Sequence, residues 1–245
     1  MRKNRRNYIT SFILSVATIL HPEVQAQNGV QLFRNADVPV EKRVADLLSR
    51  LTVEEKVSLL DTTWNPETFR DLANTFERIG AAEKTQWLPY YYAALANVNL
   101  GYSMMNMNGQ STPDAAKIDP LADKAEEMIN KAEALSKDNS EIYVVKKMIA
   151  SLRMMVDPMS RWMKYGPVAQ EALETAKRLN AENPRTFLLE GQDKFYTPEQ
   201  FGGSKTEAKK LFETAIAKFD AFKPESSIHP RWGRRTTEYF LKQAN

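Results

Sequence analysis

The chain has 245 residues, no cysteine, only two histidines, 42% apolar residues and a formal net charge of +3. The missing cysteine excludes disulfides, thiolate metal sites, a cysteine nucleophile and a cysteine-linked lipid anchor. Nine glycines in a chain of this length favour helices over a turn-rich β fold.

Residues 1–26 predict a secretory signal peptide. Four basic residues precede the short apolar run 9–20, and Val24-Gln25-Ala26 offers small residues for cleavage. An uncleaved anchor is the alternative. Removing four basic and one acidic residue from 34 and 31 leaves 30 of each, a net charge near zero. We therefore expect a periplasmic or extracellular protein that has no membrane span after cleavage and binds no nucleic acid.

Residues 27–64 form a predicted lead-in to the main domain. In the run VPVEKRVADLLSRLTVEEKVSLL, the apolar residues Val44, Leu47, Leu48 and Leu51 are spaced as on one face of a helix. Thr52 and Glu55 predict a capping box at the start of a second helix. This stretch, about residues 37–60, resembles the start of family 3 glycoside hydrolases. Nothing after it resembles the barrel of those enzymes. A natural fusion, a recruited export leader and a gene-assembly artefact all remain open.

From residue 65 onward the pattern predicts helices in pairs. Asn65-Pro66 and Asn183-Pro184 each combine a capping residue with proline at the first helical position. Apolar residues at helical spacing then mark each helix. The predicted helices cover about residues 66–83, 88–105, 121–135, 140–156, 167–180, 184–195, 205–221 and 230–242.

An internal repeat supports this pairing. Residues 131–143 align without a gap with residues 175–187, at an offset of 44 against roughly 34 in tetratricopeptide repeats. We interpret the excess as a loop insertion over residues 156–166. Alanines at positions 132, 176 and 215 predict close approach where one helix crosses the next.

Three further motifs carry a second resemblance. E-K-x-x-W-L-P-Y-Y-Y occurs at residues 83–92, Y-T-P-x-x-F-G-G at 196–203 and F-K-P-x-S-x-x-H-P-x-W-G at 222–233. With them, residues 65–245 resemble tetratricopeptide-repeat proteins exported by Gram-negative bacteria. The resemblance implies an all-α fold, a tetratricopeptide-like helical-hairpin solenoid of about 3–4 repeats, and no stated biochemical activity.

Catalytic and cofactor motifs are weak. The Asp-Trp motif that carries the nucleophile in family 3 glycosidases is absent, and residues 202–205 lack the spacing of a phosphate loop. We expect those glycines to make a turn, Ser204 to cap a helix and Glu207 to complete a capping box. His229 lacks a partner for a metal site or triad and favours a capping or packing role. We therefore predict no catalytic residue, no cofactor, no metal site and no enzyme activity.

Methionines and aromatic residues admit more than one interpretation. The methionines could bind Cu(I), but methionine more often fills gaps between helices or lines an adaptable groove. Met148 and Met155 lie on an apolar helical stripe, so we expect both in the core. Residues Trp87, Tyr90, Tyr91 and Tyr92 cover all sides of a helix. Some of these rings must belong to the core, and one or two could face a sugar or a peptide.

The leading functional hypothesis is a non-enzymatic protein–protein interaction module of the cell envelope. Stacked helix pairs leave a concave surface that takes a peptide or a partner protein. Cations expected on the first helix of each pair favour an acidic or carboxylate-bearing partner. The predicted binding residues are Lys131, Lys177, Arg178, Lys209 and Lys210, among further polar residues Arg70, Asn74, Lys124 and Glu171. The alternatives are an accessory protein of carbohydrate utilisation and an inactive fragment of a family 3 glycosidase.

Overall fold

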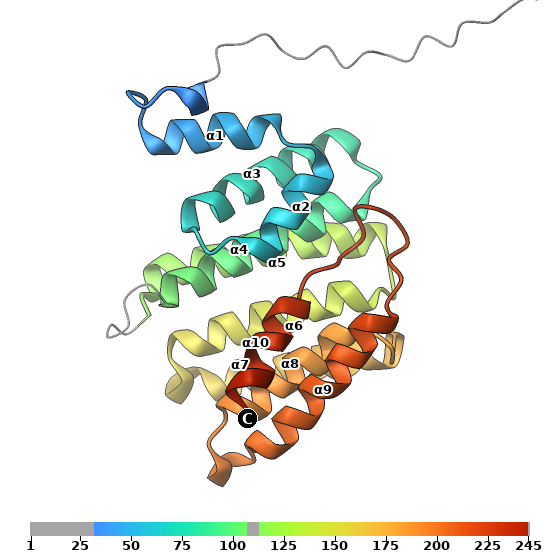
Figure 1. The fold of residues 1–245 in the computed structure, drawn as a ribbon. Helices are drawn as coiled ribbons and strands as arrows, with labels where there is room; N and C mark the ends of the chain where they lie inside the picture. Colours follow the sequence, from blue (N-terminus) through green and yellow to red (C-terminus); the bar gives the residue numbers. More distant parts are fainter. Residues whose placement is uncertain (1–31, 107–112, 245) are drawn as a thin grey trace, which may run out of the picture. The chain divides into compact units, whose positions relative to one another are not determined.

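The computed structural model describes residues 32–106 and 113–244, and these residues confirm the all-α class (Figure 1). Within them no strand occurs. The predicted signal peptide lies outside the described residues. The elements are η1 (Leu32–Arg34), α1 (Val40–Arg50), α2 (Val53–Thr62), α3 (Pro66–Glu83), α4 (Trp87–Asn106), α5 (Ala115–Leu135), α6 (Ser140–Val156), α7 (Pro158–Leu179), α8 (Pro184–Tyr196), η2 (Glu199–Phe201), α9 (Lys205–Ala221) and α10 (Arg234–Gln243).

Side-chain caps begin most of these helices, as the sequence predicts. Thr52 and Glu55 form the expected capping box of α2, and Asn65, Asn139 and Asn183 accept backbone N–H bonds at the starts of α3, α6 and α8. At α9 the prediction is half correct. Ser204 accepts from the Glu207 N–H, but the Glu207 carboxylate pairs instead with Lys194 at 2.7 Å. That pair ties the start of α9 to α8.

Helix α4 is the centre of the larger core. Its residues 91–98 are all buried, and it contacts α3, α5 and α6. A helix that is apolar all round needs partners on every side, so α4 is enclosed. Small residues let its neighbours approach: a side chain at Gly80 of α3 would meet the Tyr90 ring at 2.8 Å, and Ala132 of α5 is fully buried. Ala176 of α7 is fully buried as well, where Ser140 of α6 donates to its carbonyl.

The offset of 44 is visible in three dimensions. Lys146 of α6 pairs with Glu133 of α5 at 2.6 Å, and one repeat later Glu190 of α8 pairs with Lys177 of α7. The two ion pairs occupy equivalent positions with their charges exchanged. Each lysine also lies over the equivalent ring, Tyr143 or Phe187. The pairs α5–α6 and α7–α8 are therefore two copies of one unit.

The predicted loop insertion over residues 156–166 is wrong. Helix α6 ends at Val156, and α7 begins two residues later at Pro158, capped by Asp157, which accepts from the Ser160 N–H at 3.3 Å. Helix α7 then runs for 22 residues through Pro167. Long helices, not an inserted loop, account for the long repeat period.

The connection between α9 and α10, residues 222–233, is called here the C-terminal strap. It contacts residues far earlier in the chain (Figure 1). Ser227 donates to Glu54 at 2.9 Å, the Tyr92 hydroxyl donates to the Ile228 carbonyl at 2.6 Å, and the Gly233 N–H donates to Asp61 at 3.0 Å. Helix α10 begins at Arg234, four residues later than predicted, because the strap occupies those residues.

Candidate functional site

A groove of about 580 Å³ lies between α5, α6 and α7, and is called here the α5–α7 groove. Ile129, Ile149, Ala150, Val168 and Ala172 provide its apolar surface. Its polar and aromatic lining consists of Asp123, Glu126, Asn130, Tyr143, Lys146, Arg153, Lys164, Tyr165, Glu171 and Thr175. Helices α5 and α7 both pack against α6, and the groove lies between them.

Most of the charges in this groove are paired. Arg153 contacts Asp123 at 2.6 Å and Glu126 at 2.7 Å, and Lys146 contacts Glu133. A hydrogen bond with Glu133 and partial burial raise the pKa of the Tyr143 hydroxyl. Lys164 Nζ lies 4.9 Å from the centre of the Tyr165 ring and forms no ion pair with the described residues. The pKa of Asp119 is lowered mainly by its hydrogen bond to Arg161 and, to a smaller degree, by the charge of Lys164. The groove therefore offers an apolar surface with one unpaired cation.

An exposed apolar cluster adjoins the groove at the start of α7. It consists of Met155, Met159, Trp162 and Met163, with exposed fractions of 42%, 94%, 57% and 82%. The Trp162 ring lies over Gly166, where an added side-chain carbon would meet it at 2.9 Å. Met148 is buried as the sequence predicts, but Met155 is 42% exposed, so the prediction that it belongs to the core is wrong. Large exposed apolar patches are typical of interaction surfaces, so these residues form a candidate one.

A second groove, of about 640 Å³, lies where the α5–α6 and α7–α8 turns meet the C-terminal strap. Trp87 lines it, so one ring of the aromatic run faces a groove, whereas Tyr91 and Tyr92 are buried. His229 packs between Trp87 and Phe222, with ring centres 6.4 and 6.0 Å away. Burial lowers the pKa of His229. The packing role predicted for this histidine fits its position.

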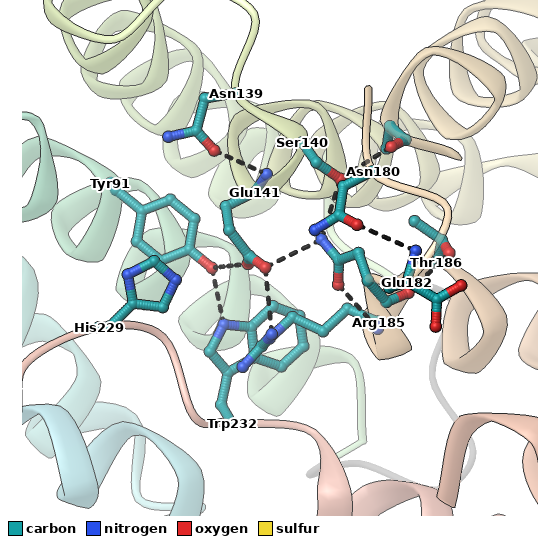
Figure 2. A network of polar contacts seen from close by, with 12 residues as sticks. Tyr91, Asn139, Ser140, Glu141, Asn180, Glu182, Arg185, Thr186, His229 and Trp232 are labelled. Carbon is teal, nitrogen blue, oxygen red and sulfur yellow. Dashed lines mark hydrogen bonds and ion pairs between the residues drawn. The ribbon is translucent and has the colours of Figure 1, made fainter. Parts of the chain in front are cut away.

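A buried polar network lies beneath the second groove (Figure 2). Arg185 is fully buried and donates to Glu141 at 3.1 Å, and Tyr91 and Asn183 donate to the same carboxylate. Trp232 of the strap donates to the Tyr91 hydroxyl at 2.7 Å. Within the part of the chain that the structure describes, Nε and Nη2 of Arg185 have no hydrogen-bond partner. Rings of Phe219, Phe222 and Trp232 lie 5.2–5.7 Å from its guanidinium carbon.

The sequence-predicted binding residues do not form one cluster. Lys131 pairs with Glu127 at 2.6 Å, Lys177 pairs with Glu190, and Arg178 donates to Thr175 at 3.3 Å. Lys209 and Lys210 lie on α9. None of the five lines either groove; of the further polar residues, Glu171 does. Sequence reasoning missed Lys164 and Tyr165 because it placed them in a loop.

Other classes of site receive no support within the described ranges. No group of three or more histidine, aspartate or glutamate side chains there could hold a metal ion. None of the helices in residues 32–106 and 113–244 combines the length and apolar character required to cross a membrane.

Comparison with known proteins gives a match among solved structures. No protein-family model and no curated protein matches the chain, so the tetratricopeptide and glycoside hydrolase resemblances stay predictions. Among solved structures, the HusA haemophore from Porphyromonas gingivalis matches with a TM-score of 0.68 and 33% sequence identity. The match covers 79% of this chain and 90% of that one. The chain belongs to the same family as the HusA haemophore.

Proposed function

We propose that the chain is an exported, non-enzymatic carrier that binds haem in the α5–α7 groove. The observation that carries the proposal is the 33% identity to the HusA haemophore over 90% of that chain. A haemophore carries haem, and a relative this similar supports the same ligand class. Export is supported by the same relationship and by the predicted signal peptide.

The chemistry of the groove supports this ligand. Haem is a flat, largely apolar ring with two carboxylates, and small-molecule sites are typically mostly apolar clefts of roughly 300–1,000 Å³. The α5–α7 groove, at about 580 Å³, has this size and an apolar surface. The second groove has a more polar lining, with Lys137, Asp138 and Asn139 on one side and Glu182 and Lys218 on the other.

A partner protein is a second candidate ligand, and the exposed cluster of Met155, Met159, Trp162 and Met163 favours it. Flexible thioethers adapt to irregular surfaces, and tryptophan is enriched among residues that dominate binding energy. This cluster replaces the cations Lys131, Lys177, Arg178, Lys209 and Lys210 as our proposed protein-binding surface, because the first three of them already contact residues of their own chain. The role in carbohydrate utilisation stays an untested alternative.

Titration of the purified chain with haemin, followed by absorbance, tests the proposal. Val168 is half exposed in the groove, and Val168→Glu places a charge against the apolar ring. We expect binding to weaken about tenfold or more, since burying an unpaired charge is costly. Val53→Glu, an exposed valine at the start of α2, is the matched control and should bind haemin normally.

Two results would contradict the proposal. One is the absence of haemin binding by the wild-type chain. The other is equal affinity of wild type and Val168→Glu, when circular dichroism shows that both are folded.

A further inference from the structure

We infer that Lys164 binds a carboxylate of the ligand and that Glu171, on the same face of α7, sets the direction in which the ligand lies. The inference rests on the proposed function, because it assigns roles within the α5–α7 groove. Lys164, Val168 and Glu171 all line that groove. Their spacing of four and seven residues places them in one row along the helix.

The basic residues of the groove differ in whether they already form ion pairs. Arg153 is held between Asp123 and Glu126, and Lys146 is held by Glu133. A ligand carboxylate at either residue would compete with an existing ion pair at 2.6–2.7 Å. Lys164 is exposed, lies over the Tyr165 ring and forms no ion pair with the described residues, since Asp119, the acid whose pKa its charge lowers, is paired with Arg161. It is therefore the cation that can accept a new anionic partner without losing an old one.

The acidic residues of the groove also differ in whether they form ion pairs. Asp123 and Glu126 are engaged with Arg153, whereas Glu171 is exposed and has no cationic partner among the described residues. Lys164 and Glu171 are therefore the two charged residues of the groove that form no ion pair with the described residues. They lie seven residues apart on α7, a rise of about 10.5 Å.

This separation of charge gives the groove a direction. An apolar ring can lie along Val168, with its acidic edge at Lys164 and away from Glu171. Haem carries both carboxylates on one edge, so it meets this requirement. An apolar ring without carboxylates would gain nothing from Lys164 and lose nothing to Glu171. The groove therefore selects ligands that are flat, apolar and acidic along one edge.

The test compares haemin with its dimethyl ester, which has the same ring and no ionised carboxylate. For haemin, Lys164→Met should weaken binding roughly fivefold, the upper range for a partly exposed ion pair. Glu171→Gln should strengthen it roughly twofold, by removing repulsion. For the ester, neither substitution should change the affinity. Lys210→Met, on α9 outside both grooves, is the control for loss of a surface charge.

The outcomes separate this inference from the proposed function. If haemin and its ester respond equally to Lys164→Met, or if Glu171→Gln weakens haemin binding, the roles assigned to these residues are wrong while haem binding stands. If the wild-type chain binds neither ligand, the proposed function fails and the inference fails with it.

Discussion

Arg185 is a full positive charge that the fold encloses completely. It occupies the position equivalent to Glu141 one repeat earlier, and the two side chains bond to each other at 3.1 Å. The pair therefore joins consecutive repeats at corresponding points. Buried ion pairs contribute little net stability, but removal of one partner leaves an isolated charge in the interior. We infer that this pair fixes how the two repeats and the C-terminal strap fit together.

The first prediction concerns this pair. Arg185→Leu and Glu141→Leu should each lower the free energy of unfolding by about 3–5 kcal/mol, because each leaves a buried charge without its partner. The double variant should lose clearly less than the sum of the two. Denaturation in urea measures all three. Additive losses would mean that the two side chains act independently.

Asp61 provides a prediction with a pH dependence. Burial raises the pKa of its carboxyl above the ordinary value of 3.8. The folded state then holds this proton more tightly than the unfolded state, so stability falls as pH rises through the raised pKa. Asp61→Asn keeps an acceptor for the Gly233 N–H and removes the ionisation.

Asp61→Asn should therefore be more stable than wild type at neutral pH, and this advantage should vanish below pH 3.8. Unfolding in urea at both pH values gives the comparison. An advantage that is the same at both would show that ionisation of Asp61 has no part in it.

At the scale of single elements, the small residues at helix crossings lead to a third prediction. Ala176 is fully buried, and its carbonyl accepts from Ser140 at 2.8 Å, so a larger side chain has no room. Ala176→Trp should lower the free energy of unfolding by at least about 1–3 kcal/mol. Glu174→Ala, an exposed change two residues away, should cost less than about 0.5 kcal/mol. Equal shifts in Tm would contradict this packing.

The exchanged ion pairs lead to a fourth prediction. Lys177→Glu places two acids together at Lys177 and Glu190, and adding Glu190→Lys restores the pair in the orientation that Glu133 and Lys146 already use. The double variant should recover about 0.5–1 kcal/mol of the stability that the single variant loses. A double variant as unstable as the single one would mean that the two copies are not equivalent.

Local capping signals predict several of the helix starts, but the start of α7 was missed. The side chains of Asn65, Asn139 and Asn183 each accept a hydrogen bond from a backbone N–H two or three residues later. Such a cap can be recognised from the neighbouring residues of the sequence alone. The start of α7 was missed although Asp157-Pro158 has the same pattern as Asn65-Pro66, because the prediction begins this helix at Pro167, which lies inside it. That error placed Lys164 and Tyr165 in a loop, and the α5–α7 groove was missed with them.

At the scale of the whole described domain, the C-terminal strap is the feature that the sequence could not show. Its bonds join residues 136–173 positions apart, such as Ser227 with Glu54. Neither periodicity nor capping carries information over such separations. The motif at residues 222–233 marks the strap, but only its neighbours reveal that it holds the first helices and the last together.

The fifth prediction tests that connection. Trp232→Ala removes the bond to Tyr91 and the ring beside Arg185, and should cost about 3 kcal/mol. Amide hydrogen exchange should increase in α2 and α3, which are remote in sequence, as well as in α10. Tyr239→Ala, an exposed aromatic residue of α10, should leave exchange unchanged. Faster exchange confined to α10 would show that the strap does not stabilise the first helices.

The strap also restricts how this protein can evolve. Repeat arrays commonly grow or shrink by duplication and deletion of whole units, since each unit contacts only its neighbours. Here one more helix pair between α6 and α9 would carry Trp232 and Gly233 away from Tyr91 and Asp61, unless the strap became longer at the same time. We therefore expect the number of helix pairs to be inherited unchanged wherever these two contacts are kept, while the surface of α7 is free to diverge.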